Sequence, residues 1–496
     1  MLEVLRSVQG STLIAVAALG IIAGIPLATI DHDEGFFFQP AMSAAAKGTF
    51  SCPWTEEFLG QTHFIPLNSL VPLLLTPMVG MGEQALWGGR LLSSFAVLVG
   101  LVALARLVSP QLQSNRCSKL VLALASTSLP LWLYARFIRP EAYVFLASCL
   151  IVYIVLVRKN PCSWVLGGLA GIACLAHGVY GPFVVVFTTM LLLAHPTSSF
   201  RERLRIIAGV ATGLVFVPTA FYLWYGVAPA KLAGQIRLFL EITPSVTTPG
   251  GPIEQFMDWC RSTRGQTHEI PLLVAVAACC FCSRNYTQTP AARAIKWFIV
   301  LYFVIAIFIY PKKTLSSACI ILPAVVAWVG QCYSVCRKVE FRIVERMLIA
   351  ALVLNCLLSV RYHWRLFAIQ ENALAETARL AKAVKTHTGK NAVTILAKDW
   401  MIFSLSERDR LYDICIFPVA HRYFSGVEGQ VAQVLDNLDA VIIEVLVDGQ
   451  AIDAIQADLL SRYRKKKWAE KRGSLIRLFT KQDVILLIRP SVSPEE

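Results

Sequence analysis

The chain has 496 residues, of which 56% are hydrophobic and only 16% are charged. Soluble domains carry roughly a quarter charged residues, so this composition excludes an ordinary soluble protein and indicates a polytopic membrane protein. The formal net charge is +14, but the positive residues lie mainly in short loops between apolar runs, where they set membrane topology. We therefore expect a lipid bilayer, and no nucleic acid, as the partner of this charge.

Cysteine usage gives no metal site. Most of the 14 cysteines lie within apolar runs, where a free cysteine behaves as a small hydrophobic residue. Cys279 and Cys282 have the spacing of a metal-binding pair, but no histidine or carboxylate lies near them in the sequence, so packing explains them better. A divalent cation is compatible with the sequence but is not required by it, and the cofactor stays unknown.

Eleven apolar runs predict transmembrane helices. The first is too long for the apolar core of a cleavable signal, so we expect it to be retained. In chain order the runs are Ser11–Ile30, Ala85–Ala105, Leu120–Tyr134, Ala142–Val157, Trp164–Ala176, Val179–Leu193, Ile206–Tyr225, Ile270–Cys282, Trp297–Tyr310, Ser316–Val335 and Met347–Val360. Residues 31–61 read as a polar-aromatic loop. Leu67–Gly82 is apolar but broken by prolines, and predicts a re-entrant or interfacial helix or the lead-in to the second span.

Charge orients the spans. With the N-terminus inside, the inside loops are basic, as the positive-inside rule requires; they are Arg106–Lys119, Arg158–Lys159, Arg201–Arg205, Arg284–Lys296 and Arg337–Arg346. The outside face then receives loops 31–65 and 226–268 and, because the number of spans is odd, the C-terminal segment.

The composition changes after Arg361, which divides the chain into a transmembrane domain, 1–361, and a soluble α/β domain, 362–496. Alternating and helical hydrophobic periods predict both kinds of element in the second domain. We expect strands at Ala392–Ala397, Ala440–Leu446, Leu475–Phe479 and Val484–Ile488, and helices at Glu371–His387, Gly429–Leu438 and Ala451–Tyr463. No phosphate loop, catalytic triad or metal spacing is present there, so we interpret this domain as a docking or acceptor-recognition lid.

The outside face gathers charged residues at the ends of several spans. They are Asp33 and Glu34 after the first span, Arg136, Arg139 and Glu141 between the third and fourth, His177 between the fifth and sixth, and Lys312 and Lys313 after the ninth. Carboxylates there can deprotonate a hydroxyl, and cations can neutralise a phosphate. We therefore expect these groups to converge on one face and to serve transfer from a lipid-linked phosphate to an alcohol.

Each group also has a structural explanation. Arg and Lys at the ends of spans often only anchor the helix, and His177 with Gly178 makes a simple tight turn equally well. The adjacent carboxylates Asp33 and Glu34 are harder to explain in this way, because two like charges at a bilayer surface are costly without partners.

An ordered series of motifs resembles the GT-C membrane glycosyltransferases, in particular the bacterial branch of the protein O-mannosyltransferase and lipid A aminoarabinose transferase superfamily. The series covers about residues 11–335. It consists of Asp33-Glu34 with Ala41-Met42 and Lys47-Gly48-Thr49-Phe50, then His63-x-x-Pro66-Leu67, Arg90-Leu91-Leu92-Ser93, Ala135-Arg136-x-x-Arg139-Pro140-Glu141, Leu175-Ala176-His177-Gly178, and Pro311-Lys312-Lys313 followed by Leu322-Pro323. The sequence departs from the family pattern at His177, where Lys is frequent, and at Glu141, where Asp is common.

The resemblance implies inverting transfer of a sugar from a polyprenyl-phosphate donor to a hydroxyl acceptor on a lipid, glycan or protein. Asp33 would be the general base, and Glu34 would orient the acceptor or a metal. Glu141 and His63 would support the acceptor side. The residues implied for the donor phosphate are Arg136, Arg139, His177, Lys312 and Lys313.

The resemblance further implies a bacterial inner-membrane enzyme with a cytoplasmic N-terminus and a periplasmic C-terminal domain, because the inserted lumenal domain of the eukaryotic relatives has no counterpart here. Two other functions use the same residues. A transporter or flippase of a lipid-linked or anionic substrate would bind it with the same charges, but related halves, which such machines often have, are not evident. A non-catalytic scaffold would not need the ordered acidic and basic motifs.

Overall fold

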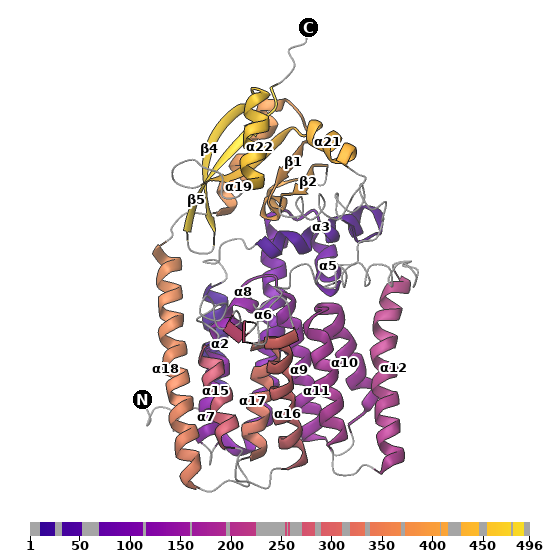
Figure 1. The fold of residues 1–496 in the computed structure, drawn as a ribbon, viewed down its shortest axis with the longest axis vertical. Coiled ribbons are helices and arrows are strands. Elements are labelled where there is room, and N and C mark those ends of the chain that lie inside the picture. The colour runs from indigo at the N-terminus through magenta and orange to yellow at the C-terminus, as the bar shows by residue number, and fades with distance from the viewer. Residues whose placement is uncertain are drawn as a thin grey trace. The chain divides into compact units, whose positions relative to one another are not determined.

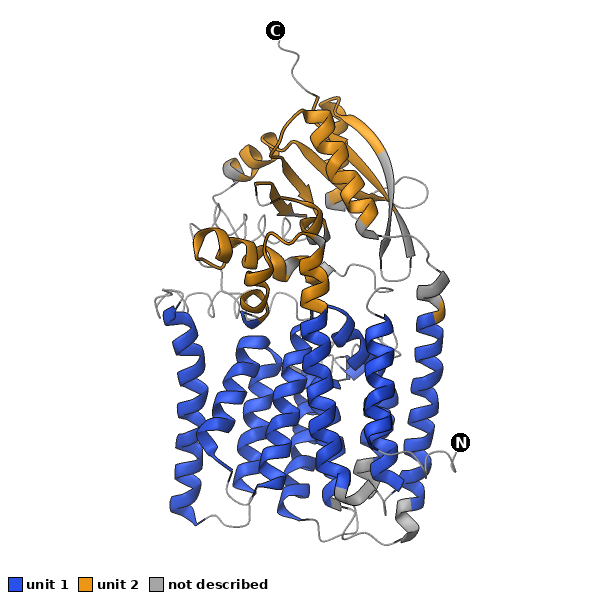
Figure 2. Cartoon of the chain, turned by 180° about the vertical axis from the view of Figure 1, so that it is seen from behind, with its two compact units in different colours: residues 1–24, 67–70, 91–363 blue, residues 25–66, 71–90, 364–496 orange. Residues whose placement is uncertain are grey.

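The computed structural model describes most of the chain. The described residues are 10–24, 32–51, 69–112, 116–158, 161–194, 199–224, 253–254, 256–257, 270–282, 289–309, 318–332, 338–368, 373–406, 408–414, 428–445, 454–477 and 480–490. They form two compact units (Figure 2). Unit 1 comprises residues 1–24, 67–70 and 91–363, and unit 2 comprises 25–66, 71–90 and 364–496.

Unit 1 is a helical bundle whose helices run side by side (Figure 1). Among the described residues, six helices are long and apolar enough to cross a membrane, and four shorter helices are also apolar. The helices are α2 (Gly10–Gly24), most of α6 (Glu83–Leu112), α7 (Arg116–Ser126), α8 (Leu129–Arg136), α9 (Pro140–Val157), α10 (Ser163–Ala176), α11 (Tyr180–Leu193), α12 (Phe200–Trp224), α15 (Ile270–Cys282), α16 (Pro290–Val304) with the π-helical η5 (Ile305–Ile309), α17 (Ala318–Cys332) and α18 (Lys338–Ala368).

An apolar helix lies at the position of every predicted span, so the polytopic helical fold class is confirmed. Two of them differ in form from the prediction. The third span is interrupted between α7 and α8, and the last, α18, extends well beyond Met347–Val360 at both ends. The extension of α18 includes basic residues that a hydropathy pattern excludes from an apolar run.

Small residues allow α10 and α12 to pack closely. A Cβ on Gly167 would lie 2.3 Å from the backbone oxygen of Val210, and one on Gly213 would lie 2.2 Å from that of Trp164. Such spacing of small residues lets transmembrane helices approach backbone to backbone. Many apolar side chains of α12 are exposed, among them Phe216 at 69%, which suits a helix that faces lipid.

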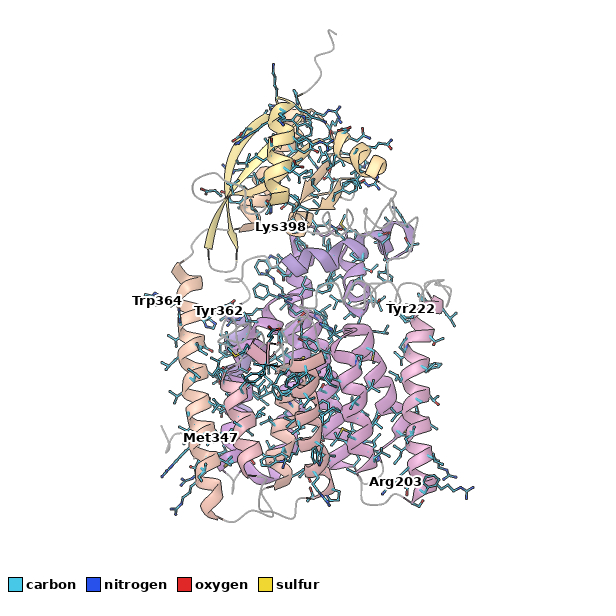
Figure 3. All side chains as sticks on the ribbon, viewed as in Figure 1. Arg203, Tyr222, Met347, Tyr362, Trp364 and Lys398 are labelled. Atoms are coloured by element: carbon cyan, nitrogen blue, oxygen red, sulfur yellow. The ribbon has the colours of Figure 1, made fainter. Side chains whose placement is uncertain are left out.

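The two ends of unit 1 differ in composition. The α12 and α18 helices both begin with basic residues and end with aromatic ones, and they run in the same direction: Arg203 and Met347 lie toward one end of the bundle, and Tyr222 and Tyr362 toward the other (Figure 3). Thus two of the basic segments expected on the inner side, those at the starts of α12 and α18, share one end of the bundle.

Unit 2 contains α3 (His32–Lys47), α5 (Leu70–Leu75) with the short η1 (Thr76–Met78), the first residues of α6, and the C-terminal α/β segment. The α3 helix corrects the sequence prediction of a loop at 31–61. It forms because Phe37, Phe38, Ala41 and Ala44 recur at helical spacing and are all buried, while Gly48, with φ of 70°, ends it.

The C-terminal segment forms a five-stranded sheet in the order β2-β1-β3-β5-β4. Its elements are α19 (Ala373–Thr388), β1 (Thr394–Ala397), η6 (Asp399–Ser404), β2 (Arg410–Asp413), α21 (Glu428–Asp436), β3 (Ala440–Val445), α22 (Ala454–Lys465), β4 (Ala469–Arg477) and β5 (Thr480–Ile488). The β1 strand pairs in parallel with β2 and β3, whereas β5 pairs antiparallel with β3 and β4. The expected α/β arrangement is present, but β2 was not predicted.

Candidate active site

A buried ion pair anchors the start of α3. Arg90 of α6 donates through Nε to Oε1 of Glu34 over 2.8 Å and through Nη2 to Oε2 over 2.7 Å. Both side chains are at most 1% exposed. A guanidinium that engages both carboxylate oxygens fixes their orientation as well as their distance. The pair therefore ties α3 to α6 across 56 residues of sequence.

One turn after Glu34, the same helix contacts the C-terminal segment. The ring of Phe38 lies 5.0 Å from that of Phe403, centre to centre, in η6 directly after strand β1. Asp33 lies within α3 next to Glu34, and its side chain is outside the described part of the structure. His63, Lys312 and Lys313 also lie outside the described residues.

Arg136, at the end of α8, is buried within unit 1. Its side chain is 1% exposed, its Nη2 donates to the backbone oxygen of Gly20 over 2.6 Å, and its guanidinium lies 5.1 Å from the ring centre of Trp132. A Cβ on Gly24 would lie 2.0 Å from its Cζ, so only glycine leaves room for it. Among the described residues, Nε and Nη1 of Arg136 have no hydrogen-bond partner. A buried cation with two uncommitted N–H groups is a candidate anion ligand.

Arg139 and Glu141 surround the start of α9. Arg139 is the residue before the helix and its backbone N–H donates to Oγ of Ser93 over 3.5 Å, while Oγ of Ser94 donates to the backbone oxygen of Ala135 over 2.7 Å. These serines of α6 hold the segment between Arg136 and Arg139. Glu141 is 8% exposed in the first turn of α9, where a carboxylate also stabilises the helix dipole.

His177 makes a hydrogen-bonded turn between α10 and α11. Its Nδ1 accepts from the backbone N–H groups of Val179 and Tyr180, over 3.2 and 3.4 Å. An accepting Nδ1 places the proton of the neutral ring on Nε2. The tight-turn interpretation of His177 therefore agrees with its geometry.

The break between α7 and α8 is stabilised by a polar residue that sequence reasoning missed. Asn355 of α18 donates through Nδ2 to the backbone oxygen of Thr127 over 2.5 Å, and its Oδ1 accepts from the backbone N–H of Leu129 over 3.2 Å. In an apolar surrounding, backbone groups left over at a helix break need such partners. A lone amide inside the last apolar run was the available signal.

No metal centre is evident in the part of the chain that the structure describes, where no three histidine, cysteine or acidic side chains come together. The site residues fall into two groups. Glu34 and Arg90 belong to unit 2, and Arg136, Arg139, Glu141 and His177 belong to unit 1. Convergence of the two groups on one substrate stays a prediction.

Comparison with known proteins then decides the fold. Neither a protein-family model nor a curated protein matches the sequence. Two crystal structures of ArnT from Cupriavidus metallidurans are similar to this chain, one in the apo state and one bound to undecaprenyl phosphate. Each has a TM-score of 0.57 and 14% sequence identity, and the match covers 95% of this chain and 97% of the ArnT chain. This chain has the GT-C fold. The GT-C fold, a helical membrane part with a C-terminal α/β segment, was the fold that the ordered motifs predicted.

Proposed function

We propose that this protein is an integral-membrane inverting glycosyltransferase that moves a sugar from a polyprenyl-phosphate donor to a hydroxyl acceptor. The observation that carries the proposal is the match to ArnT over nearly the whole of both chains, one of the ArnT structures being bound to undecaprenyl phosphate. The apolar helices, the buried Arg136 and the anchored acidic helix α3 support it independently.

In this proposal Asp33 is the general base. It accepts the proton of the acceptor hydroxyl as the oxygen attacks the anomeric carbon from the face opposite the phosphate. The bond from the anomeric carbon to the phosphate oxygen breaks, and polyprenyl phosphate leaves with the bonding electron pair. Glu34, held by Arg90 through both oxygens, keeps α3 and hence Asp33 in position. The acceptor stays unspecified, and so does the sugar.

The leaving phosphate gains charge and needs cations. Arg136 is suited to this task through its free Nε and Nη1, and Arg139, Lys312 and Lys313 are the further candidates. His177 would act through Nε2–H as a neutral donor. Preorganised donors at a developing charge are commonly the largest catalytic contribution, and loss of one costs about a hundredfold to a thousandfold in rate.

The proposal is tested by the binding of undecaprenyl phosphate to the purified full chain, measured by native mass spectrometry. Arg139→Ala is the informative variant, because the hydrogen bond of Arg139 to Ser93 uses the backbone and survives the change. Loss of one charge-assisted contact of about 1.5–3 kcal/mol should weaken binding about 10- to 100-fold. Arg203→Ala, at the opposite end of unit 1 from Tyr222, is the control and should bind as wild type does (Figure 3).

Transfer itself is tested by mass spectrometry of cell-envelope glycans from cells with the wild-type gene, without it, and with Asp33→Asn. We expect a sugar modification that is present only with the wild-type gene. Undecaprenyl phosphate binding without any dependent modification would favour the transporter or flippase instead. A reporter fused at Glu496 should read as external, in keeping with the proposed inner-membrane topology with a cytoplasmic N-terminus.

A further inference from the structure

Three residues of α3 form a row along the face that meets the rest of unit 2. Glu34, Phe38 and Met42 lie four positions apart, and residues at this spacing share one face of a helix. The first of them is held by Arg90 of α6 through both oxygens of its carboxylate. The other two face η6, the short helix that follows β1 in the C-terminal segment. The α3 helix is therefore held at two successive places by elements far along the chain.

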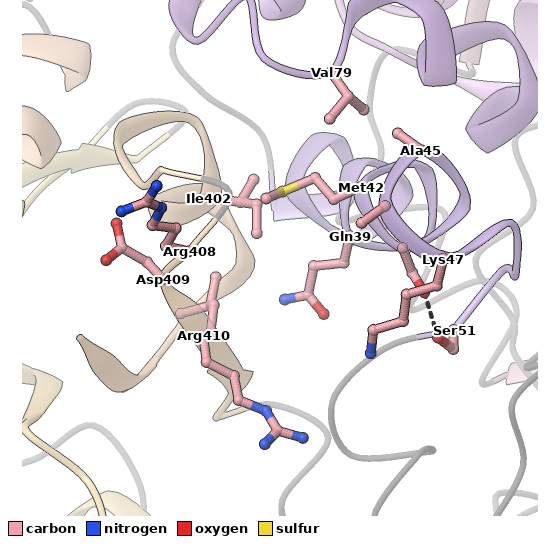
Figure 4. A pocket seen from close by; sticks show the side chains of 13 residues that line it. Gln39, Met42, Ala45, Lys47, Ser51, Val79, Ile402, Arg408, Asp409 and Arg410 are labelled. Carbon is pink, nitrogen blue, oxygen red and sulfur yellow. Dashed lines mark hydrogen bonds between the residues drawn. The ribbon is translucent and has the colours of Figure 1, made fainter. Parts of the chain in front are cut away.

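The contact between α3 and η6 is apolar. The ring centres of Phe38 and Phe403 lie 5.0 Å apart, and both residues are at most 4% exposed. One turn further along α3, Met42 and Ile402 line the same cavity of about 450 Å³. Figure 4 shows these two side chains pointing toward one another. Apolar contact from η6 thus adds to the ion pair in fixing α3.

The position of η6 is fixed at both of its ends. A 3-10 helix of 6 residues has little stability of its own, so its surroundings must hold it. At its start Lys398 forms an ion pair with Glu444 of β3, and both side chains are at most 8% exposed. At its end Ser404 shares a hydrogen bond of 2.5 Å with Thr377 of α19. Because β3 and α19 belong to the C-terminal segment, the fold of that segment determines where Phe403 lies.

The proposed base belongs to the same helix. Asp33 lies in the first turn of α3, five positions before Phe38, which corresponds to about 7.5 Å along the helix axis at 1.5 Å per residue. A shift of α3 at Phe38 therefore also moves Asp33. A general base must lie within hydrogen-bond reach of the hydroxyl that it deprotonates, and misplacement of a reacting group by about 1 Å can cost about a hundredfold in rate.

We propose that the C-terminal segment positions the base: η6, through Phe403, sets the placement of α3 and so of Asp33 toward the acceptor hydroxyl. This inference rests on the proposed glycosyl transfer and gives the segment a role other than the acceptor-recognition lid expected from the sequence. Phe403 is a positioning residue, because it acts through α3. The buried pair of Lys398 and Glu444 then serves to place η6, which explains charged residues where apolar ones are often equally stable.

The test compares Phe403→Ala and Phe403→Leu with wild type in the full chain. Purified protein is added to membranes from cells that lack the gene, which supply donor and acceptor. Mass spectrometry then gives the initial rate of the gene-dependent glycan modification over a series of membrane concentrations. A misplaced base loses a contact made only in the transition state. We therefore expect the maximal rate to fall about 100-fold for the alanine variant and about tenfold for the leucine variant, with the membrane concentration at half-maximal rate unchanged.

Hydrogen exchange reports on α3 without any substrate. Its backbone amides should exchange at least tenfold faster in Phe403→Ala than in wild type, whereas those of α10 in unit 1 should be unchanged. The matched control is Leu459→Ala. Leu459 of α22 is 1% exposed and packs in a cluster of the C-terminal segment in which, among the described residues, none belongs to α3. This control should destabilise the segment but keep the maximal rate and the exchange of α3 close to those of wild type.

Three results would overturn the inference: the maximal rate of wild type in folded Phe403→Ala, unchanged exchange of α3 in that variant, or an equal fall in rate in Leu459→Ala. A higher half-maximal membrane concentration with an unchanged maximal rate would also overturn it, because η6 would then bind the acceptor. If Phe403→Ala does not fold, Phe403→Leu is judged by the same criteria. A wild type that neither binds undecaprenyl phosphate nor modifies a glycan refutes the proposed function. A wild type that does both, beside an unaffected Phe403→Ala, refutes this inference alone.

Discussion

The ion pair between Glu34 and Arg90 gives the sharpest test of how α3 is held. Arg90 engages both carboxylate oxygens at 2.8 and 2.7 Å, and water reaches at most 1% of either side chain. We expect Arg90→Met and Glu34→Leu, made separately, to destabilise the protein strongly, because each leaves the other charge buried without its counterion.

The expected magnitude follows from this burial. Removing one partner of a buried ion pair costs about 3–5 kcal/mol, whereas replacing both partners with apolar residues of similar volume is often neutral or stabilising. If the two effects were independent, the double variant would lose about 6–10 kcal/mol. We expect the double variant Glu34→Leu/Arg90→Met to lie within about 2 kcal/mol of wild type, which corresponds to a coupling free energy of at least about 4 kcal/mol.

The assay is the midpoint temperature of heat-induced loss of the monodisperse peak, measured by size-exclusion chromatography of detergent-purified protein. Midpoints are ranked rather than converted to free energies, because a chain with two compact units need not unfold in one step. A matched control is the pair Arg116 and Glu345, 3.4 Å apart, in which Arg116 is 50% exposed. Breaking that pair should change the midpoint little, since exposed pairs contribute about 0–1 kcal/mol.

A double variant no more stable than the weaker single variant would refute the reasoning, because it would show that the charges do not depend on each other. Transfer activity of the stable double variant shows in addition whether the Glu34 carboxylate takes part in the reaction. Partial activity would agree with Glu34 acting only by holding α3, and a stable but inactive double variant would assign its carboxylate a part in the chemistry.

Three further predictions concern single positions. Gly24→Ala should displace the Arg136 guanidinium, because the new Cβ would lie 2.0 Å from Cζ. Native mass spectrometry should then show undecaprenyl phosphate binding weakened at least tenfold. The control Gly168→Ala, whose new Cβ would make only a 3.7 Å contact, should leave this binding unchanged. Asn355→Leu should lower the midpoint of heat-induced aggregation by removing hydrogen bonds worth about 1–2 kcal/mol in a membrane protein. The pKa of Asp409 is lowered because hydrogen bonds to its carboxylate outweigh the opposing effect of burial. The ionised carboxylate therefore stabilises the folded protein fully above the ordinary pKa of 3.8, and this stabilisation is lost as the pH falls through the lowered pKa. We expect Asp409→Asn to destabilise the full chain at pH 7 and to make its stability less sensitive to acid.

The membrane helices could be predicted from the sequence because one physical requirement governs them. A span needs a long apolar run, and the run is visible without knowledge of its neighbours. The predicted Ile270–Cys282 coincides with α15 residue for residue. The limits of α18 were missed because Arg342 and Arg346 continue the helix with charged side chains that the apolar pattern cannot contain.

The α3 helix was missed for a different reason. Residues 31–61 lack an apolar run and include Pro40, so composition suggested a loop. The helical spacing of Phe37, Phe38, Ala41 and Ala44 was present in the sequence, but it shows which face is buried only once the partner surfaces are known. Those surfaces are α6 with Arg90 and η6 with Phe403, which lie far along the chain.

The candidate site shows the same division between local and distant information. Asp33 and Glu34 stood out because adjacent carboxylates at a bilayer surface are costly, a property readable from the sequence. Arg90 was visible only as part of a motif, since nothing local indicates that it neutralises Glu34. Arg90 holds Glu34 through both carboxylate oxygens, and in the proposed reaction Glu34 therefore fixes the helix while the proton of the acceptor goes to Asp33. The resemblance implied a substrate or metal contact for Glu34, and the double variant described above distinguishes that role from anchoring.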